Sequence, residues 1–162
     1  MADTTNNANS ASAIREGSEA DRTLVIERVF KAPPEKVFAA WTNPEILVKW
    51  WGPEGFGTPE HEMDVREGGA WRTVMRNDKG EDHVVSGVYR DISPAKRLVL
   101  TWAWEQPDGS RGHETLVELT FEPAGDGTRM RLVQRLFETV EGRDNHRMGW
   151  DSSFNCLEQV FA

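Results

Sequence analysis

The chain has 162 residues, a formal net charge of −8, 38% apolar residues and 28% charged residues. This length predicts one domain, and no run approaches the roughly 18 consecutive apolar residues of a transmembrane helix, so membrane insertion is not expected. The acidic balance argues against nucleic acid or an anionic membrane as the main partner, because both require a basic surface.

The first segment, residues 1–21, is small and polar, and we predict a disordered or loosely docked tail ahead of a domain at residues 22–162. The segment has neither the basic region nor the apolar region of a secretory signal. The single cysteine, Cys156, leaves no internal disulfide to form. These features together predict a cytoplasmic protein.

The domain begins with a predicted strand and two short helices. Residues 24–30 are β-branched and roughly alternating, which is typical of a strand. Pro34 suits the first turn of a helix, and one face of that helix carries Trp41, which we expect to pack in the core. Asn43 can cap a second short helix over residues 44–50.

A loop rich in glycine, proline and aromatic residues follows, with the sequence WWGPEGFGT at residues 50–58. Trp50 and Trp51 precede a segment that can be neither helix nor strand, whereas a core usually takes its aromatic residues from regular elements. We therefore predict that one indole packs inside and that the other guards the opening of a cavity. The glycines would let this loop move or turn tightly.

Six further strands are expected, because short alternating segments are separated by turns rich in glycine, proline and aspartate. They cover roughly residues 61–65, 70–77, 83–92, 97–105, 113–122 and 128–137. The final segment, residues 143–162, changes to a helical period and predicts an amphipathic helix of about four to five turns. The predicted fold class is α+β, a curved antiparallel sheet of about seven strands in the order β-α-α-β6-α. This sheet would wrap around the C-terminal helix and leave a gap beside it.

Five segments resemble a known superfamily. They read VFKAPPEKVFAAWTNPEILVKWWGP, GGAWRTVMRNDKG, GVYRDISPAKRLVLTW, TLVELTFEPAGDGTRMRLVQ and HRMGWDSSFNCLEQVFA. The order of elements resembles the START-like or Bet v 1-like (SRPBCC) helix-grip superfamily. The amino-acid sequence of these segments resembles one branch of this superfamily, the single-domain bacterial relatives of the C-terminal domain of the activator of heat shock protein 90 ATPase. The resemblance covers about residues 24–162. It implies a helix-grip fold and the binding of hydrophobic ligands or lipids, with catalysis in a minority of members.

The candidate site residues are those expected to face the gap between the sheet and the C-terminal helix. Aromatic side chains dominate the set, and its polar members are a tyrosine, a histidine and a glutamine at strand positions. The candidates are Trp50, Trp51, Phe56, Trp71, Met75, Tyr89, Trp102, Trp104, His113, Val117, Leu132, Gln134, Trp150 and Phe154. For Trp102 and Trp104, alternation leaves core packing and cavity wall as equal alternatives. A pocket of this kind typically has a volume of roughly 300–1,000 Å³.

No catalytic, metal or cofactor motif is present. The sequence has no CxxC, no HExxH and no glycine-rich loop that opens a helix. Its four histidines lie in different predicted elements, so neither a metal site nor a cofactor is expected. Cys156 is interpreted as a small core residue rather than a nucleophile. At the position of the family's usual polar residue near the end of the last strand stands Gln134, and no catalytic role is carried over to it.

Three functions follow from these observations. The first is the binding of a small hydrophobic or aromatic molecule without catalysis. The second is an enzyme of the polyketide cyclase or hydrolase type, in which Tyr89, His113 and Gln134 would act as acid, base or oxyanion partners. The third is a co-chaperone-like interaction domain. It rests on the family name alone, and the chain lacks room for the additional N-terminal domain of the eukaryotic activator. A homodimer is compatible with each.

Overall fold

Seven strands form one antiparallel sheet in the computed structural model, which describes residues 17–162. Their order across the sheet is β2-β8-β7-β6-β5-β4-β3, so all neighbours except β2 and β8 are consecutive in the chain. The strands are β2 (Leu24–Phe30), β3 (Gly57–Met63), β4 (Ala70–Arg76), β5 (Asp82–Ser93), β6 (Arg97–Trp104), β7 (Thr115–Ala124) and β8 (Gly127–Arg135). The helices are α2 (Pro34–Thr42), α3 (Pro44–Leu47) and α4 (Val140–Val160).

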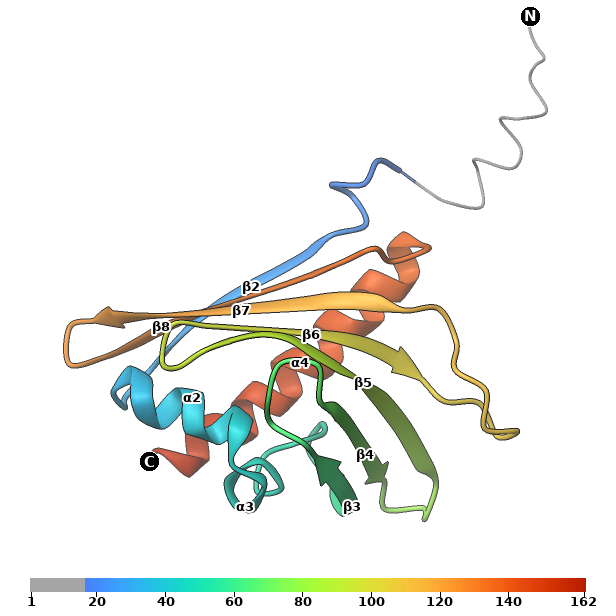
Figure 1. The fold of residues 1–162 in the computed structure, drawn as a ribbon, viewed down its shortest axis with the longest axis horizontal. Coiled ribbons are helices and arrows are strands. Elements are labelled where there is room, and N and C mark those ends of the chain that lie inside the picture. The colour runs from blue at the N-terminus through green and yellow to red at the C-terminus, as the bar shows by residue number, and fades with distance from the viewer. Residues whose placement is uncertain (1–16) are drawn as a thin grey trace, which may run out of the picture.

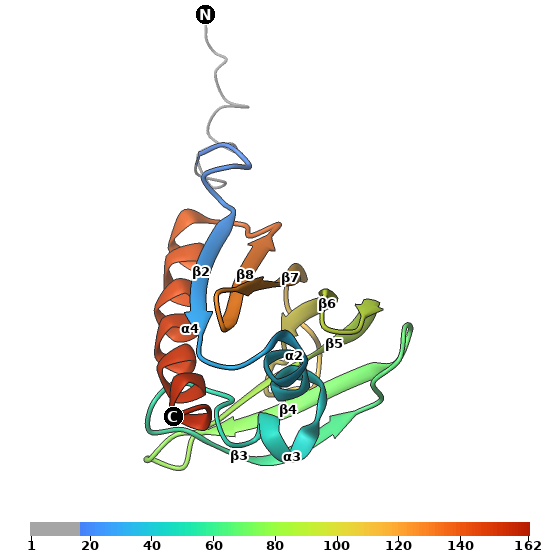
Figure 2. The same cartoon turned by 90° about the vertical axis from the view of Figure 1, so that its left-hand side faces the viewer.

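The sheet is curved, and its two ends lie on opposite sides of an arc (Figure 2). Helix α4 runs beside β2 in both views, while α2 and α3 lie within one end of the arc (Figures 1 and 2). The predicted α+β helix-grip fold, with seven strands and the order β-α-α-β6-α, is therefore confirmed. Of the predicted tail, residues 1–16 lie outside the described residues, and residues 17–21 form bends and turns.

The two short helices begin where the sequence predicts. Pro34 is the first residue of α2, and the side chain of Asn43 accepts a hydrogen bond of 3.0 Å from the Glu45 N–H at the start of α3. Helix α3 is shorter than predicted and ends at Leu47. Beyond it, the N–H groups of Lys49 and Trp50 bond three residues back, which tightens the chain into turns.

Strand β3 covers residues 57–63, whereas the sequence predicts only a short mixed segment at 61–65. Most of its residues are exposed, because β3 is the edge of the sheet and neither of its faces is fully covered. An edge strand of this kind lacks the apolar alternation by which strands are recognised.

Strand β7 begins at Thr115, whereas the sequence predicts a strand from residue 113. His113 therefore lies in the preceding loop and not in the strand.

Helix α4 has 21 residues and is longer than predicted, because it begins at Val140. The side chain of Thr139 accepts a hydrogen bond of 2.9 Å from the Gly142 N–H and caps the first turn. The helical period predicts an apolar stripe of Trp150, Phe154, Leu157 and Phe161; the first three are buried, and Phe161 is half-buried at the C-terminal cap. Burial of such side chains contributes about 1.5–3 kcal/mol each, so α4 is integral to the fold.

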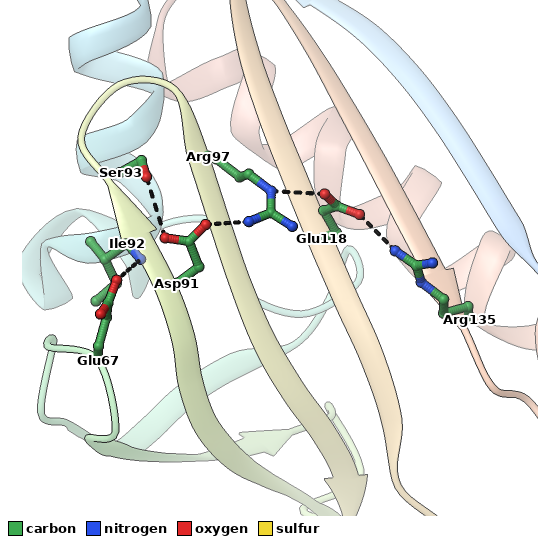
Figure 3. A network of polar contacts seen from close by, with 7 residues as sticks. All are labelled: Glu67, Asp91, Ile92, Ser93, Arg97, Glu118 and Arg135. Atoms are coloured by element: carbon green, nitrogen blue, oxygen red, sulfur yellow. Dashed lines mark hydrogen bonds and ion pairs between the residues drawn. The ribbon is translucent and has the colours of Figure 1, made fainter.

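The outer face of the sheet carries a row of ion pairs across four strands (Figure 3). Arg97 on β6 pairs with Asp91 on β5, and its Nε donates to the Glu118 carboxylate on β7 at 2.8 Å. Arg135 on β8 donates to the same carboxylate at 2.8 Å. Helix α4 lies behind the sheet in this view, so the charged face is turned away from the core. The inner face is therefore the apolar face of the sheet.

Candidate ligand-binding cavity

A cavity of about 570 Å³ lies between α4, the inner face of the sheet and the loop that follows α3. Its wall is mainly apolar, and among residues 17–162 no Lys, Arg, Asp or Glu side chain contributes to it. The lining residues are Trp51, Gly52, Pro53, Phe56, Met75, His83, Trp102, Trp104, Asn145, His146, Gly149, Trp150 and Ser153. This volume falls within the range of small-molecule sites, and the wall has the usual character of such sites, mostly apolar with a few polar groups.

Three buried indoles form what we call the aromatic floor of the cavity: Trp51, Trp102 and Trp150. The centroids of Trp102 and Trp150 lie 5.0 Å apart, and Trp51 lies 5.9 Å from each of them. These separations are in the range in which aromatic rings attract one another. Because the rings come from the loop, from β6 and from α4, the floor joins three parts of the chain.

Hydrogen bonds fix two of the three floor rings. The indole N–H of Trp51 donates to the Thr73 hydroxyl at 2.9 Å. The indole N–H of Trp150 donates to the Gln134 side-chain oxygen at 2.8 Å, and the amide nitrogen of Gln134 donates to the Thr115 hydroxyl at 2.8 Å. Gln134 is fully buried and engaged at both ends, so it orients Trp150 from behind and does not reach the cavity.

His146 is a polar group in the cavity wall, and its neighbours set its protonation state. Its Nδ1 lies 2.7 Å from the Gly142 carbonyl oxygen, and its Nε2 accepts a hydrogen bond of 3.0 Å from the Trp104 indole N–H. Nδ1 therefore carries the proton and Nε2 is an acceptor, which is the neutral form of the ring. Burial lowers the pKa of His146 and also favours this form. With both nitrogens engaged, the ring is not a free acid or base.

The loop after α3 borders the entrance. The ring of Phe56 is half-buried and lies 5.6 Å from the exposed ring of His83. Gly52 has a φ of +98°, a backbone conformation that residues with a side chain rarely adopt. Glycine at this position therefore lets the loop turn into the cavity wall. The Glu54 N–H donates to the Ser152 hydroxyl on α4 at 2.8 Å and ties the loop to the helix.

The structure brings together part of the predicted set. Trp51, Phe56, Met75, Trp102, Trp104 and Trp150 line the cavity. Other predicted residues pack in the core and do not line the cavity: Trp50, Val117, Leu132 and Phe154. Of the two adjacent tryptophans, Trp50 therefore packs inside, and its N–H donates to the Ala40 carbonyl at 2.9 Å. Trp51 lines the cavity as part of its floor, and Phe56 stands at the entrance.

Trp71 packs against the floor from outside the cavity, with its centroid 5.6 Å from that of Trp102. Its cross-strand partner on β5 is Gly87. A Cβ atom at Gly87 would lie 2.7 Å from the Trp71 indole nitrogen and 1.9 Å from the Thr101 carbonyl oxygen. Glycine is therefore required at position 87, because a side chain would overlap both the Trp71 ring and the backbone of β6.

The three polar candidates do not meet at the cavity. Tyr89 is buried beside a narrow interior gap of about 10 Å³, and burial raises the pKa of its hydroxyl well above the usual value. His113 is exposed, and its ring contacts the Leu136 carbonyl. Gln134 is enclosed behind Trp150. In this structure the three groups border different parts of the molecule, whereas acid, base and oxyanion partners need to converge on one substrate.

Several lining residues were missed by the sequence interpretation. Three of them, His146, Gly149 and Ser153, lie on α4 and share one helix face with the predicted Trp150. The helical period could have identified them, because Trp150 was already predicted to face the cavity. Pro53, His83 and Asn145 have no such signal, since each lies at the rim and its place depends on how the segments meet.

Three further features bear on function: metal sites, membrane-spanning helices and a reactive thiol. Among residues 17–162, no cluster of His, Cys, Asp and Glu side chains has the arrangement of a metal site. Within the same range, no helix has the length and apolar content needed to cross a membrane. Cys156 is half-buried on α4, and burial, with a smaller effect of Glu54, raises the pKa of its thiol. A raised pKa disfavours the thiolate, which is the reactive form.

Comparisons with known proteins agree on one family. The model of the family described as "Activator of Hsp90 ATPase homolog 1-like protein" matches residues 31–162. The human protein named "Activator of 90 kDa heat shock protein ATPase homolog 1" is 23% identical over 140 residues, which are 86% of this chain and 37% of that protein. The chain thus spans little more than a third of this curated relative.

Solved bacterial structures match along most of their length. An AHSA1 protein from Silicibacter pomeroyi is 36% identical, with a TM-score of 0.79 over 85% of this chain and 95% of that chain. A protein from Chromobacterium violaceum is 28% identical, with a TM-score of 0.79 over 86% of this chain and 96% of that chain. The architecture described above is therefore shared with experimentally determined relatives.

Proposed function

The chain belongs to the activator of Hsp90 ATPase homolog 1-like family, within the Bet v 1-like (SRPBCC) superfamily, and we propose that it binds a small, uncharged aromatic or hydrophobic molecule. The binding site is the cavity between α4 and the inner face of the sheet. The observation that carries this proposal is the composition of the cavity wall, an aromatic floor with apolar sides and a volume of about 570 Å³.

The absence of charge in the wall defines the ligand class. None of the Lys, Arg, Asp or Glu residues that the structure describes lines the cavity, His146 is held in its neutral form, and His83 lies at the exposed rim. A carboxylate that enters such a site loses its hydration without gaining a counter-charge, which costs several kcal/mol. The proposal therefore favours neutral ring systems over fatty acids and other organic anions.

The two rival functions have less support. An enzyme would need convergent polar groups, and Tyr89, His113 and Gln134 border different regions. The co-chaperone function rests on the printed name of the human relative, of which the chain spans 37%. An enzyme would use the same cavity, whereas the co-chaperone function leaves the open volume between apolar side chains without a role.

A matched pair of fluorescent probes tests the ligand class. N-phenyl-1-naphthylamine is uncharged, and 8-anilinonaphthalene-1-sulfonate has the same ring framework with a sulfonate added. We expect the uncharged probe to bind at least about tenfold more tightly, because a tenfold difference needs only about 1.4 kcal/mol of the desolvation cost. Fluorescence titration of the purified protein measures both affinities. Equal affinities at the cavity would overturn the restriction to neutral ligands.

A cavity-filling variant tests the location. A Cβ atom at Gly149 has no neighbour within 4 Å, so the first side-chain carbon of Gly149→Leu fits at the wall and the remaining carbons extend into open space beside it. This change is expected to abolish binding of the neutral probe while the thermal transition is kept or raised, because glycine weakens helices. Gln159→Leu, at an exposed position of the same helix, is the matched control and should bind normally. Unchanged binding in Gly149→Leu would refute the proposed site.

A further inference from the structure

A second hollow lies on a different part of the molecule, where the C-terminal end of α4 approaches α2 and α3 (Figures 1 and 2). Its volume is about 500 Å³. Three lysines from three separate segments surround it: Lys31 before α2, Lys36 on α2 and Lys49 after α3. We call this hollow the lysine groove. It shares no lining residue with the aromatic cavity.

The positive charge of the lysine groove is not neutralised by the described part of the protein. The chain has five lysines, at positions 31, 36, 49, 79 and 96, and the first three line the groove. Within residues 17–162 no ion pair uses a lysine, whereas arginines are paired repeatedly, as in the row across the outer face (Figure 3). On a chain of net charge −8, three unpaired ammonium groups in one hollow are a local exception.

The ends of two helices add smaller charges of opposite sign. Helix α2 begins at the groove; its cap residue Pro33 offers no side-chain acceptor, and Glu35 in the first turn partly offsets the positive end of the helix. Helix α4 ends at the groove, and its carbonyl end contributes about half a negative charge. The three lysines therefore leave a positive excess.

The base of the lysine groove is apolar. Ile46, Val160 and Phe161 are half-buried there, and the ring of Phe161 packs on Phe30 with centroids 5.9 Å apart. A ligand that fits the groove therefore needs negative charges at its sides and apolar groups beneath them. An extended peptide with alternating acidic and apolar residues has this division, because successive side chains point to opposite sides of a strand.

We propose that the lysine groove docks a short acidic segment of a partner protein, in which Asp or Glu alternates with apolar residues. All three lysines are exposed, and an exposed ion pair contributes only about 0–1 kcal/mol. A small anion that meets one or two of them gains little, whereas a segment that meets all three and covers the base adds these contributions. An extended polyanion such as nucleic acid or an anionic membrane is repelled by the acidic remainder of the protein.

The test uses a short fluorescein-labelled peptide in which Asp and Glu alternate with Leu and Phe. Fluorescence polarisation measures its affinity for the full chain and for two charge-matched variants. We expect Lys36→Glu/Lys49→Glu, inside the groove, to lose at least about tenfold in affinity. Lys79→Glu/Lys96→Glu, in two exposed turns outside it, carries the same change in charge and should stay within about twofold of the parent. Circular dichroism confirms that both variants fold.

Other arms of the experiment define what would overturn the proposal. Equal losses in the two double variants would show general charge attraction without a site. If an all-Glu peptide binds as tightly as the alternating peptide, or if Ile46→Ser binds the alternating peptide as tightly as the parent, the apolar base does not contribute to binding and the proposed peptide pattern is wrong. Co-sedimentation with anionic vesicles that Lys36→Glu/Lys49→Glu abolishes, without peptide binding, would replace the peptide by a lipid surface. Gly149→Leu should leave peptide binding unchanged, so this inference and the proposed function fail separately.

Discussion

At the scale of single residues, the tryptophans decide how much of the inner face is open. All seven belong to one group of neighbouring rings, and five of their indole N–H groups have hydrogen-bond partners. Within residues 17–162, the buried N–H groups of Trp71 and Trp102 have none. An unpaired buried donor costs about 1–3 kcal/mol, so packing against other rings must hold these two in place. The protein retains large flat surfaces beside the cavity despite this cost.

The pair of Trp104 and His146 predicts a dependence on pH. The pKa of His146 lies below its usual value, so as pH falls from about 6.5 the unfolded chain takes up the proton first. Stability from this group is therefore complete above that pH and is lost as pH falls towards the folded-state pKa. A proton on Nε2 would face the Trp104 N–H, two donors in one contact, and should release the ring and weaken binding of the neutral probe.

Tryptophan fluorescence and probe affinity measured between neutral and mildly acidic pH check this expectation. The exposed ionisable groups His113 and Glu138 border the adjoining hollow, so the control must isolate the His146 ring. His146→Gln keeps a neutral acceptor near Trp104 and removes the titration. Its affinity should stay flat over the range in which the parent loses binding. A parallel decline in both proteins would assign the effect to another group.

At the scale of elements, α4 supplies one side of the cavity and also closes the core. Its first half carries His146, Gly149 and Trp150 to the cavity, and its second half buries Phe154 and Leu157. The helix is held at its edge by Arg28 on β2, which donates to the Asn155 side chain at 2.9 Å and lies over the Phe154 ring. The direction of α4, and with it the cavity wall, depends on where the helix begins.

The cap of α4 can be tested directly. Thr139→Ala removes the acceptor for the Gly142 N–H and should cost about 1 kcal/mol of the free energy of unfolding. It should also weaken binding of the neutral probe, because the first turns of α4 carry His146. Urea unfolding and probe titration measure the two effects. Thr139→Ser keeps the hydroxyl and should behave as the parent, and an equal loss in both variants would contradict the capping role.

At the scale of the whole molecule, the curved sheet needs α4 to cover its inner face. The charged row on the outer face is compatible with water, whereas the inner face is lined by aromatic and aliphatic side chains. The partially open space at one end of this core is the cavity, and the lysine groove lies outside the core at the other end of α4. Two regions of different chemistry are thus joined by one helix.

Removal of this helix should expose the inner face. A chain truncated after Gly142 is expected to aggregate, because Phe154 and Leu157 no longer cover the sheet and a large apolar patch meets solvent. Leu157→Ala is the milder form and should cost about 2–5 kcal/mol in urea unfolding. Analytical ultracentrifugation distinguishes aggregation from a soluble monomer. A soluble truncated chain with a cooperative thermal transition would show that the helix is an appendage.

The sequence by itself determined the elements and their faces. Periodicity is a local property, so the alternation of the strands and the stripe of Trp150, Phe154 and Leu157 could be read without coordinates. The resemblance of five segments to a known branch then supplied their arrangement. The bounds predicted for the edge strand β3 and for the start of α4 were incomplete, because exposed residues show no apolar period.

Only the tertiary structure decided which residues meet. Trp50 and Trp51 have the same local sequence, yet one packs in the core and the other lines the cavity. The alternation pattern places Tyr89, His113 and Gln134 on strands that could converge, but in the structure Tyr89 lies beside an interior gap, His113 lies in the loop before β7, and Gln134 is enclosed behind Trp150. The lysine groove likewise needs three segments to approach the end of α4. Such meetings depend on distances between parts of the chain far apart in sequence, which are fixed by the curvature of the sheet and the path of the helix across it.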